Sequence, residues 1–470
     1  MTTKHAAMPV SLQEAILSLL AFDGPHGAAV AVQVNADHFD GLFRDAAQAI
    51  LGYRKKYGKP PGRQHLIGLL DRLTGGGRGQ LTKRMLETLA ASEGRLNVEY
   101  VASRAHGFVR GQIIKAALYE ATDRYVAGED EAMVPDVEQI LYAALRSRQD
   151  TLDAGTFLSD KKRALAFLID QPSPVPLGIP LLDQFGVGIL PKELLLYIAG
   201  KGTGKSWFAV NCGRSALNHK LRVVHITLEM SEARVVQRYY QSFFAIAHKP
   251  DAFWRATLES DSLGRFTRFK KEMETPELNF KHPKIEGQLR HFMDMWGTRF
   301  DHLVVKEFAT SSLTMGALYG YLDFLEMTHK FIPDVLIVDY PDLMQIKRDN
   351  KRIELGGLYE ELRGLAVRRN MCVIAPTQGN RLSLKAKTVG GHMVSEDVTK
   401  INTADNVLTY SQSEGERKMG LARLHIEHAR NVETGLTVIL AQSYATGQYC
   451  RDAKLLNENY WTQLGVEVEA

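Results

Sequence analysis

Two hydrophobic patterns divide the 470-residue chain. Up to about residue 146, apolar residues recur at spacings of three and four, which predicts amphipathic helices. The turn signals GKPPG and TGGGRG separate some of these helices. We therefore expect an all-helical N-terminal domain over residues 1–148. Its clearest helical stretches are SLQEAILSLL (11–20), DGLFRDAAQAILGYRKKYG (40–58), RQHLIGLLDRL (63–73) and GQIIKAALYEATDRYV (111–126).

From about residue 181, short apolar runs alternate with helical stretches. Runs that are apolar on both faces are typical of parallel strands covered by helices. LARLHIEHAR (421–430) and LTVILAQSY (436–444) flank NVETG and predict an antiparallel hairpin. This pattern predicts an α/β domain with a mainly parallel sheet over 179–470, although residues 265–302 fit no clear element. The candidate strands are ELLLYIAG (193–200), RVVHITLE (222–229), HLVVKEF (302–308), DVLIVDY (334–340), MCVIAPTQ (371–378) and NVLTYSQ (406–412).

The segment between these domains, 149–178, is predicted to be a linker. DKKRALAFLID (160–170) has the composition of one short helix. QPSPVPLG (171–178) cannot continue that helix, because its three prolines remove backbone donors and favour extended backbone.

Composition limits the possible functions only weakly. Charged residues make up 24% of the chain and the net charge is +4, so a nucleic-acid partner has to be argued from local basic segments. The three cysteines are far apart, which disfavours a disulfide framework or zinc site and fits a cytoplasmic protein. The first apolar run, 15–22, is too short to span a bilayer, so we expect no membrane segment.

A glycine-rich stretch, AGKGTGKS (199–206), lies between a predicted strand and a predicted helix. This spacing is typical of a phosphate-binding loop, with Ala199 in place of the first glycine. Small residues allow backbone N–H groups to surround phosphate oxygens, and the helix that follows directs its positive end at them. Lys205 would reach the β- and γ-phosphates of ATP, and Ser206 would bind Mg²⁺. The nucleotide-binding residues are predicted to be Ala199, Gly200, Gly202, Thr203, Gly204, Lys205 and Ser206.

Polar residues at three strand ends supply the remaining chemistry. Asp339 follows a buried strand, where a carboxylate is costly unless it meets a cation, so we expect it at the Mg²⁺ site. Glu229 ends another strand, beside the strand before the loop, and is the candidate catalytic base. Gln378 ends a third strand and could sense the γ-phosphate. Each of the three could instead be an ordinary polar strand terminus.

The motifs GKS, TLEM, VLIVDYPDLM, TQGNR and HARN, in this order, resemble the C-terminal motor of the DnaB-type replicative helicases. The resemblance implies a RecA-like P-loop NTPase fold, and the helical N-terminal region is similar to that family's N-terminal domain. Some positions differ from the family pattern. The phosphate-binding loop is closer to that of the wider RecA-like group. The family lysine two residues before Arg430 is replaced by His428, and a family glutamine is replaced by Asp342.

The resemblance implies that Lys205, Glu229 and Gln378 act in catalysis. Arg430, in HARN, matches the arginine that family members insert into a neighbouring subunit's site. The active sites would then lie between subunits of a ring, usually a hexamer. The family also uses the short helix at 160–170 to contact the adjacent subunit, although packing within one chain is an alternative.

The segment RLSLKAKTVGGHMVS (381–395) contains basic residues and no acid. RecA-like motors place DNA-facing loops in this region, and such loops contact phosphates of a single strand. The predicted DNA-binding residues are Arg381, Lys385, Lys387 and Lys400, with a solvated loop as the alternative.

Together these features predict an ATP-dependent helicase that translocates on single-stranded DNA, 5′ to 3′ by resemblance. Its N-terminal domain would serve assembly and could bind a primase or helicase loader. A RecA-like ATPase of recombination, repair or signalling is the second possibility, and a nucleotide-dependent scaffold is the third.

Overall fold

The computed structural model describes residues 9–71, 79–127, 156–346, 351–379, 398–430 and 434–464, together with short pieces at 136–137, 140–141 and 144. The chain divides into two compact units, Met1–Ala164 and Leu165–Ala470. Their boundary falls inside the predicted linker. Among the described residues, no single helix is long and apolar enough to cross a membrane, although the helix at 10–22 and residues 26–32 would suffice as a bent pair.

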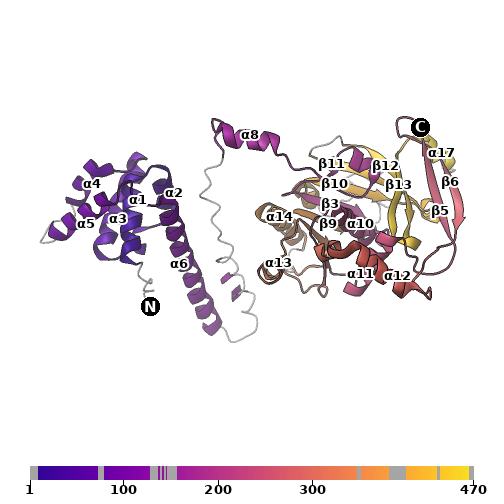
Figure 1. Cartoon of the computed structure of the whole chain (residues 1–470), viewed down its shortest axis with the longest axis horizontal. Coiled ribbons are helices and arrows are strands. Elements are labelled where there is room, and N and C mark those ends of the chain that lie inside the picture. The colour runs from indigo at the N-terminus through magenta and orange to yellow at the C-terminus, as the bar shows by residue number, and fades with distance from the viewer. Residues whose placement is uncertain are drawn as a thin grey trace. The chain divides into compact units, whose positions relative to one another are not determined.

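The first unit is helical, as the sequence predicts (Figure 1). Helix α1 lies at its centre, with Ile16, Leu17 and Leu20 fully buried against residues of the other helices. Residues 16–21 of α1 are all buried, so this part of the helix is enclosed on every side, as expected for a central helix that is apolar all round. The elements are α1 (Val10–Phe22), α2 (Pro25–Gln33), η1 (Ala36–His38), α3 (Gly41–Tyr57), α4 (Gly62–Asp71), α5 (Gly79–Ala91) and α6 (Val98–Ala127).

The second unit is built on a nine-stranded sheet with the order β13-β12-β11-β10-β3-β9-β8-β4-β7. The strands from β10 to β7 are parallel, and β11, β12 and β13 continue antiparallel. All six predicted strands and the predicted hairpin are present. The bounds are β3 (Leu194–Ala199), β4 (Val223–Thr227), β7 (Leu303–Glu307), β8 (Val335–Asp339), β9 (Cys372–Gln378), β10 (Asn406–Ser411), β11 (Leu421–Ala429), β12 (Thr437–Ser443) and β13 (Gln448–Leu455).

Helices cover both faces of this sheet (Figure 1). On one face lie α10 (Lys205–Asn218) and α11 (Glu232–Phe244), and on the other lie α13 (Met315–His329) and α14 (Lys351–Arg369). Every residue of β3, β4 and β8 is buried, which explains why these strands are apolar on both faces.

One prediction about strand order is wrong. β4, which precedes Glu229, does not lie beside β3, because β9 and β8 separate them. Both strands still end at the same edge of the parallel sheet, so their C-terminal residues face the same side of the unit.

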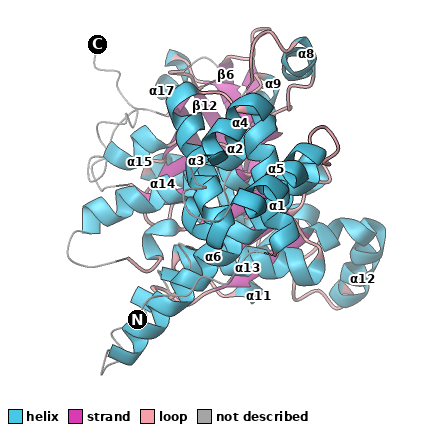
Figure 2. Ribbon diagram, turned by 90° about the vertical axis from the view of Figure 1, so that its left-hand side faces the viewer, coloured by secondary structure: helices cyan, strands magenta, loops and turns pink. Residues whose placement is uncertain are grey.

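Smaller elements complete the second unit. Val175 and Pro176 form β1 and pair with β2 (Gly188–Ile189), so ordered structure begins inside the segment predicted as linker. The unplaced stretch 265–302 contains β6 (Phe266–Glu274), α12 (Ile285–Trp296) and η4 (Gly297–His302), and β6 pairs with β5 (Phe253–Ser260). Helix α17 (Glu458–Gln463) lies beside β6 (Figure 2). The remaining elements are α8 (Lys161–Ile169), α9 (Pro180–Gln184), η5 (Pro341–Leu343), α15 (Val398–Thr403), α16 (Glu414–Met419) and η7 (Tyr444–Thr446).

Candidate functional site

The glycine-rich loop joins the carboxyl end of β3 to the start of α10. Gly202 and Gly204 both have positive φ, 73° and 107°, a conformation that side chains disfavour. A Cβ on Gly204 would also lie 2.1 Å from the Tyr444 hydroxyl oxygen. The Thr203 hydroxyl and the Lys205 ammonium both donate to the Gly200 carbonyl oxygen, at 2.7 and 3.2 Å. The loop is therefore closed on itself at the N-terminus of a helix, where anions bind favourably.

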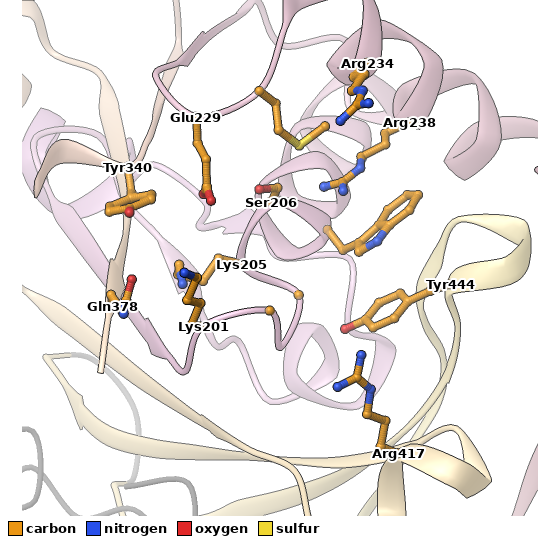
Figure 3. A pocket seen from close by; sticks show the side chains of 14 residues that line it. Lys201, Lys205, Ser206, Glu229, Arg234, Arg238, Tyr340, Gln378, Arg417 and Tyr444 are labelled. Carbon is orange, nitrogen blue, oxygen red and sulfur yellow. The ribbon is translucent and has the colours of Figure 1, made fainter. Parts of the chain in front are cut away.

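A cavity of about 570 Å³ opens above this loop (Figure 3). Most charged side chains in its lining are positive, and Glu229 is the only acidic residue among the described residues that form the wall. Such a surface suits a compact polyanion such as a triphosphate. The lining residues are Lys201, Gly202, Gly204, Lys205, Ser206, Trp207, Glu229, Met230, Arg234, Arg238, Tyr340, Gln378, Arg417 and Tyr444.

Asp339 ends β8 and is fully buried. Neither carboxylate oxygen accepts a hydrogen bond of standard geometry from a described residue. The pKa of the Asp339 carboxyl is raised to about 6, chiefly by burial. The nearby Ser206 hydroxyl opposes this shift, and the charge of Glu229 adds to it. A buried carboxylate without donors, beside a hydroxyl, has the chemistry of a cation site completed by oxygen ligands.

Glu229 is positioned by a hydrogen-bonded turn at the end of β4. The Thr227 hydroxyl donates to the Met230 carbonyl at 2.8 Å, and the Met230 N–H donates back to the same hydroxyl at 3.1 Å. The Leu228 N–H donates to the Asp339 carbonyl at 2.9 Å, which ties this turn to the end of β8. Figure 3 shows Glu229 and Lys205 directed into the same space.

Lys205 lies among these carboxylates. Burial lowers the pKa of its ammonium, and the charges of Glu229, Asp339 and Asp342 oppose that shift, with Glu229 the largest of the three. Gln378, at the end of β9, lines the opposite side of the cavity beside Tyr340 (Figure 3). The structure therefore brings the predicted catalytic residues together, except for Arg430.

Arg430 follows β11 and does not line the cavity. Its guanidinium forms an ion pair with Asp405 at 2.8 Å, and half of its side chain, 53%, is exposed. Asp405 also accepts a hydrogen bond from the Leu194 N–H at the first residue of β3. Arg430 consequently lies at the amino edge of the parallel strands, whereas the loop lies at the carboxyl edge.

The predicted DNA-binding residues are only partly open to description. Arg381, Lys385 and Lys387 lie outside the described residues. Lys400 is described, in α15, and its ammonium lies 2.6 Å from an Asp342 oxygen, with 12% of its side chain exposed. Its contact in this structure is thus an internal ion pair.

Residues that the sequence analysis missed form the outer wall of the cavity. Trp207 and Tyr444 are stacked with ring centroids 5.7 Å apart, and the Arg238 guanidinium lies 4.6 Å from the Trp207 ring centre. Arg417 enters from α16 beside Tyr444 (Figure 3). A local signal existed for Arg234 and Arg238, which are four residues apart on the helix after Glu229 and so share a face. No local signal marks Arg417 or Tyr444.

Comparisons with known proteins agree with this picture. No protein-family model matches the chain. Over 407 residues the chain is 24% identical to the replicative DNA helicase DnaB of Nostoc sp., an alignment that covers 82% of the chain and 41% of the relative. Over 316 residues it is 18% identical to the DnaB-like replicative helicase of Enterobacteria phage T4, covering 63% of the chain and 61% of the relative. The chain thus spans less than two thirds of the length of each curated relative.

A solved structure of a DnaB-like replicative helicase, described together with its interactions with primase, matches 93% of this chain and 98% of its own. The TM-score is 0.54 and the sequence identity is 15%. The likeness confirms the predicted fold class, an α/β unit with a mainly parallel sheet preceded by a helical region. The resemblance to DnaB-type helicases, predicted from short motifs, is likewise confirmed by the two curated relatives.

Proposed function

We propose that this chain is an ATP-dependent DNA helicase that forms a ring, translocates 5′ to 3′ on single-stranded DNA and unwinds duplex during replication. One observation carries the proposal: the cavity combines a phosphate loop, an unpaired buried carboxylate and Glu229 at one sheet edge, while Arg430 lies at the opposite edge. The similarity to two replicative helicases supports the same function.

In the proposed site, the backbone from Gly200 to Gly204 and the Lys205 ammonium hold the triphosphate of ATP. Ser206 and Asp339 are the residues that would hold Mg²⁺, which neutralises charge on the phosphates when bound. The Glu229 carboxylate accepts a proton from the attacking water. Gln378 hydrogen-bonds the γ-phosphate. It is the last residue of β9, and residues 380–397 follow it closely in the sequence.

Arg430 completes the site of a neighbouring copy in this proposal. A protomer cannot bring Arg430 to its own phosphate loop across the sheet, so a head-to-tail ring, with about six chains, is the assembly that uses it. Helix α8 supports such assembly. Its Leu165, Leu168 and Ile169 are 54%, 70% and 75% exposed, an apolar surface suited to covering by a second copy.

The similarity to the relatives supports a proposal about DNA and protein partners. We propose that Arg381, Lys385 and Lys387 contact phosphates of single-stranded DNA and that the helical first unit binds a primase or a helicase loader. The solved DnaB-like helicase is described with its primase interactions, which supports the second assignment.

A substitution at the proposed base tests the chemistry. Glu229→Gln keeps the size of the side chain but removes its basicity, so hydrolysis should fall by about 10²–10⁴-fold while ATP binding is retained. Glu232→Gln is the matched control, because Glu232 begins α11, is exposed and is absent from the cavity wall. Equal hydrolysis in the wild type and Glu229→Gln would remove Glu229 from the mechanism.

The motor itself is tested by hydrolysis with and without single-stranded DNA, by mass in solution with ATP and Mg²⁺, and by strand displacement on a forked duplex. A ring whose hydrolysis rises with DNA and which separates the fork supports the helicase. DNA-stimulated hydrolysis without strand displacement would instead indicate a RecA-like ATPase that is not a processive helicase.

A further inference from the structure

Asp342 joins elements that are distant in the sequence. It lies in η5, three residues after Asp339. Its carboxylate accepts hydrogen bonds from the Thr377 hydroxyl at 2.7 Å, the Tyr359 hydroxyl at 3.0 Å and the Lys400 ammonium at 2.6 Å. One side chain therefore connects η5 with β9, α14 and α15.

This cluster borders the nucleotide cavity. Thr377 directly precedes Gln378, which lines the cavity, and Asp342 is one of the acids whose charge opposes the lowering of the Lys205 pKa. A displacement of the ends of β8 or β9 therefore reaches the Asp342 carboxylate directly.

On its other side, the cluster fixes α15. The Lys400 ammonium also lies 3.4 Å from the Thr377 hydroxyl and 5.0 Å from the centre of the Tyr359 ring. Helices α14 and α15 lie side by side (Figure 2) and approach so closely that a Cβ on Gly356 would be 2.9 Å from Thr399 Cγ2. Among the described residues, Asp342 is the only acid that lies within ion-pair distance of Lys400. Without it, a mostly buried ammonium would lose its counter-ion.

Thr377 and Lys400 also stand on either side of residues 380–397 in the sequence. The Asp342 carboxylate thus binds both Thr377, which precedes that stretch, and Lys400, which follows it. If Lys400 contacted DNA directly, it would first have to break this pair.

We propose that Asp342 is a positioning residue that transmits the nucleotide state of the cavity to α15 through Thr377 and Lys400, an inference that rests on the proposed nucleotide-driven function. When phosphate binding moves the end of β9, Asp342 carries the movement to Lys400. Lys400 then acts through this ion pair and makes no contact with DNA of its own.

Hydrogen exchange tests the coupling without DNA. Adding a non-hydrolysable ATP analogue with Mg²⁺ should slow exchange of the amides at the N-terminus of α10 and, through Asp342, those of 398–403, each by about tenfold or more. In Asp342→Asn and in Lys400→Gln, α10 should still respond and 398–403 should not. Asp342→Glu should restore the response, because it keeps the charge.

Asp334→Asn is the matched control. Asp334 lies just before β8, whereas Asp342 lies just after it. The Asp334 carboxylate accepts a hydrogen bond from the Arg222 N–H at the amino end of the parallel strands, away from the cavity. This variant should respond like the wild type. If Asp342 had only a structural role, Asp342→Asn would speed exchange of 398–403 both with and without the analogue. The analogue would then still slow exchange of 398–403 in this variant as it does in the wild type, and that result would overturn the inference.

The two proposals fail in different ways. Protection of α10 without any change at 398–403 in the wild type overturns the coupling alone. Absence of protection at α10 overturns the proposed nucleotide function beneath it. A binding titration adds a second arm: if Lys400→Gln lowers the salt dependence of single-stranded DNA binding by about one phosphate contact, Lys400 contacts DNA and the inference is wrong.

Discussion

His225 occupies the middle of β4 with its ring fully buried. Its Nδ1 lies 2.9 Å from the Tyr239 hydroxyl, whereas Nε2 has no partner among the described residues. Burial and, to a smaller extent, the positive charge of Arg238 lower the pKa of this imidazole to about 3. The folded protein therefore keeps His225 neutral where an unfolded chain would protonate it.

This difference predicts a sign for acid sensitivity. Between pH 6.5 and 3 the unfolded state binds a proton that the folded state does not, so the free energy of unfolding falls as pH decreases, by about 1.4 kcal/mol per pH unit. His225→Gln should remove about 2 kcal/mol of the loss between pH 7 and pH 5, measured by urea unfolding. His291→Gln, on the exposed side of α12, is the control. An unchanged pH dependence in His225→Gln would contradict the prediction.

The same scale shows which site residues can be predicted from sequence. Asp339 and Gln378 are the last residues of β8 and β9, and Glu229 follows the end of β4 by two residues. Lys205 and Ser206 begin the helix that follows β3. The ends of parallel strands meet at one edge, so these residues can be placed together from the sequence. Arg417 and Tyr444 reach the cavity from α16, which connects β10 with β11, and from η7, which connects β12 with β13. Their position depends on how β10 to β13 pair, which no local pattern specifies.

At the scale of elements, burial on both faces explains why β3, β4 and β8 were predictable. The order of the strands could not be predicted, because it depends on pairing between segments that are distant in the sequence. The same alternation of strand and helix is compatible with many strand orders. The β5–β6 hairpin was missed for a different reason. Charged residues occupy most of β6, and its apolar Phe266 is buried in a cluster that includes Tyr460 of α17, which is distant in the sequence.

Two adjacent glycines in α14 give a matched prediction at this scale. Alanine in a helix interior is usually favoured over glycine by about 1 kcal/mol. At Gly357 an added Cβ meets nothing within 4 Å, so Gly357→Ala should raise the melting temperature of the second unit. At Gly356 the Cβ would lie 2.9 Å from Thr399, so Gly356→Ala should lower it, with about 1–3 kcal/mol lost to overpacking.

Calorimetry of both variants beside the wild type provides the measurement. Equal melting temperatures for Gly356→Ala and Gly357→Ala would show that α15 is not packed against α14 as described. Gly356→Ala combined with Thr399→Ser should recover part of the loss, because that change removes the Cγ2 atom that the new Cβ meets.

At the scale of the whole molecule, the proposed chemistry cannot be completed within one chain. The cavity lies where β3, β8 and β4 end, whereas Arg430 is bound to Asp405 where β3 and β10 begin. A strand of five or six residues separates these edges, which is well beyond the reach of an arginine side chain. Each proposed site therefore needs Glu229 from one copy and Arg430 from the next.

Mixing two inactive variants tests this division. Glu229→Gln lacks the base and Arg430→Ala lacks the finger, so each alone should lose most hydrolysis. In randomly mixed rings, about a quarter of the interfaces would pair an intact Glu229 with an intact Arg430, because the contact is head to tail. Mixing should then restore hydrolysis to about that fraction of the wild-type rate, after subunits are exchanged without nucleotide. If both residues served one chain, mixed rings would contain no intact site, and the rate would stay at the level of the separate variants.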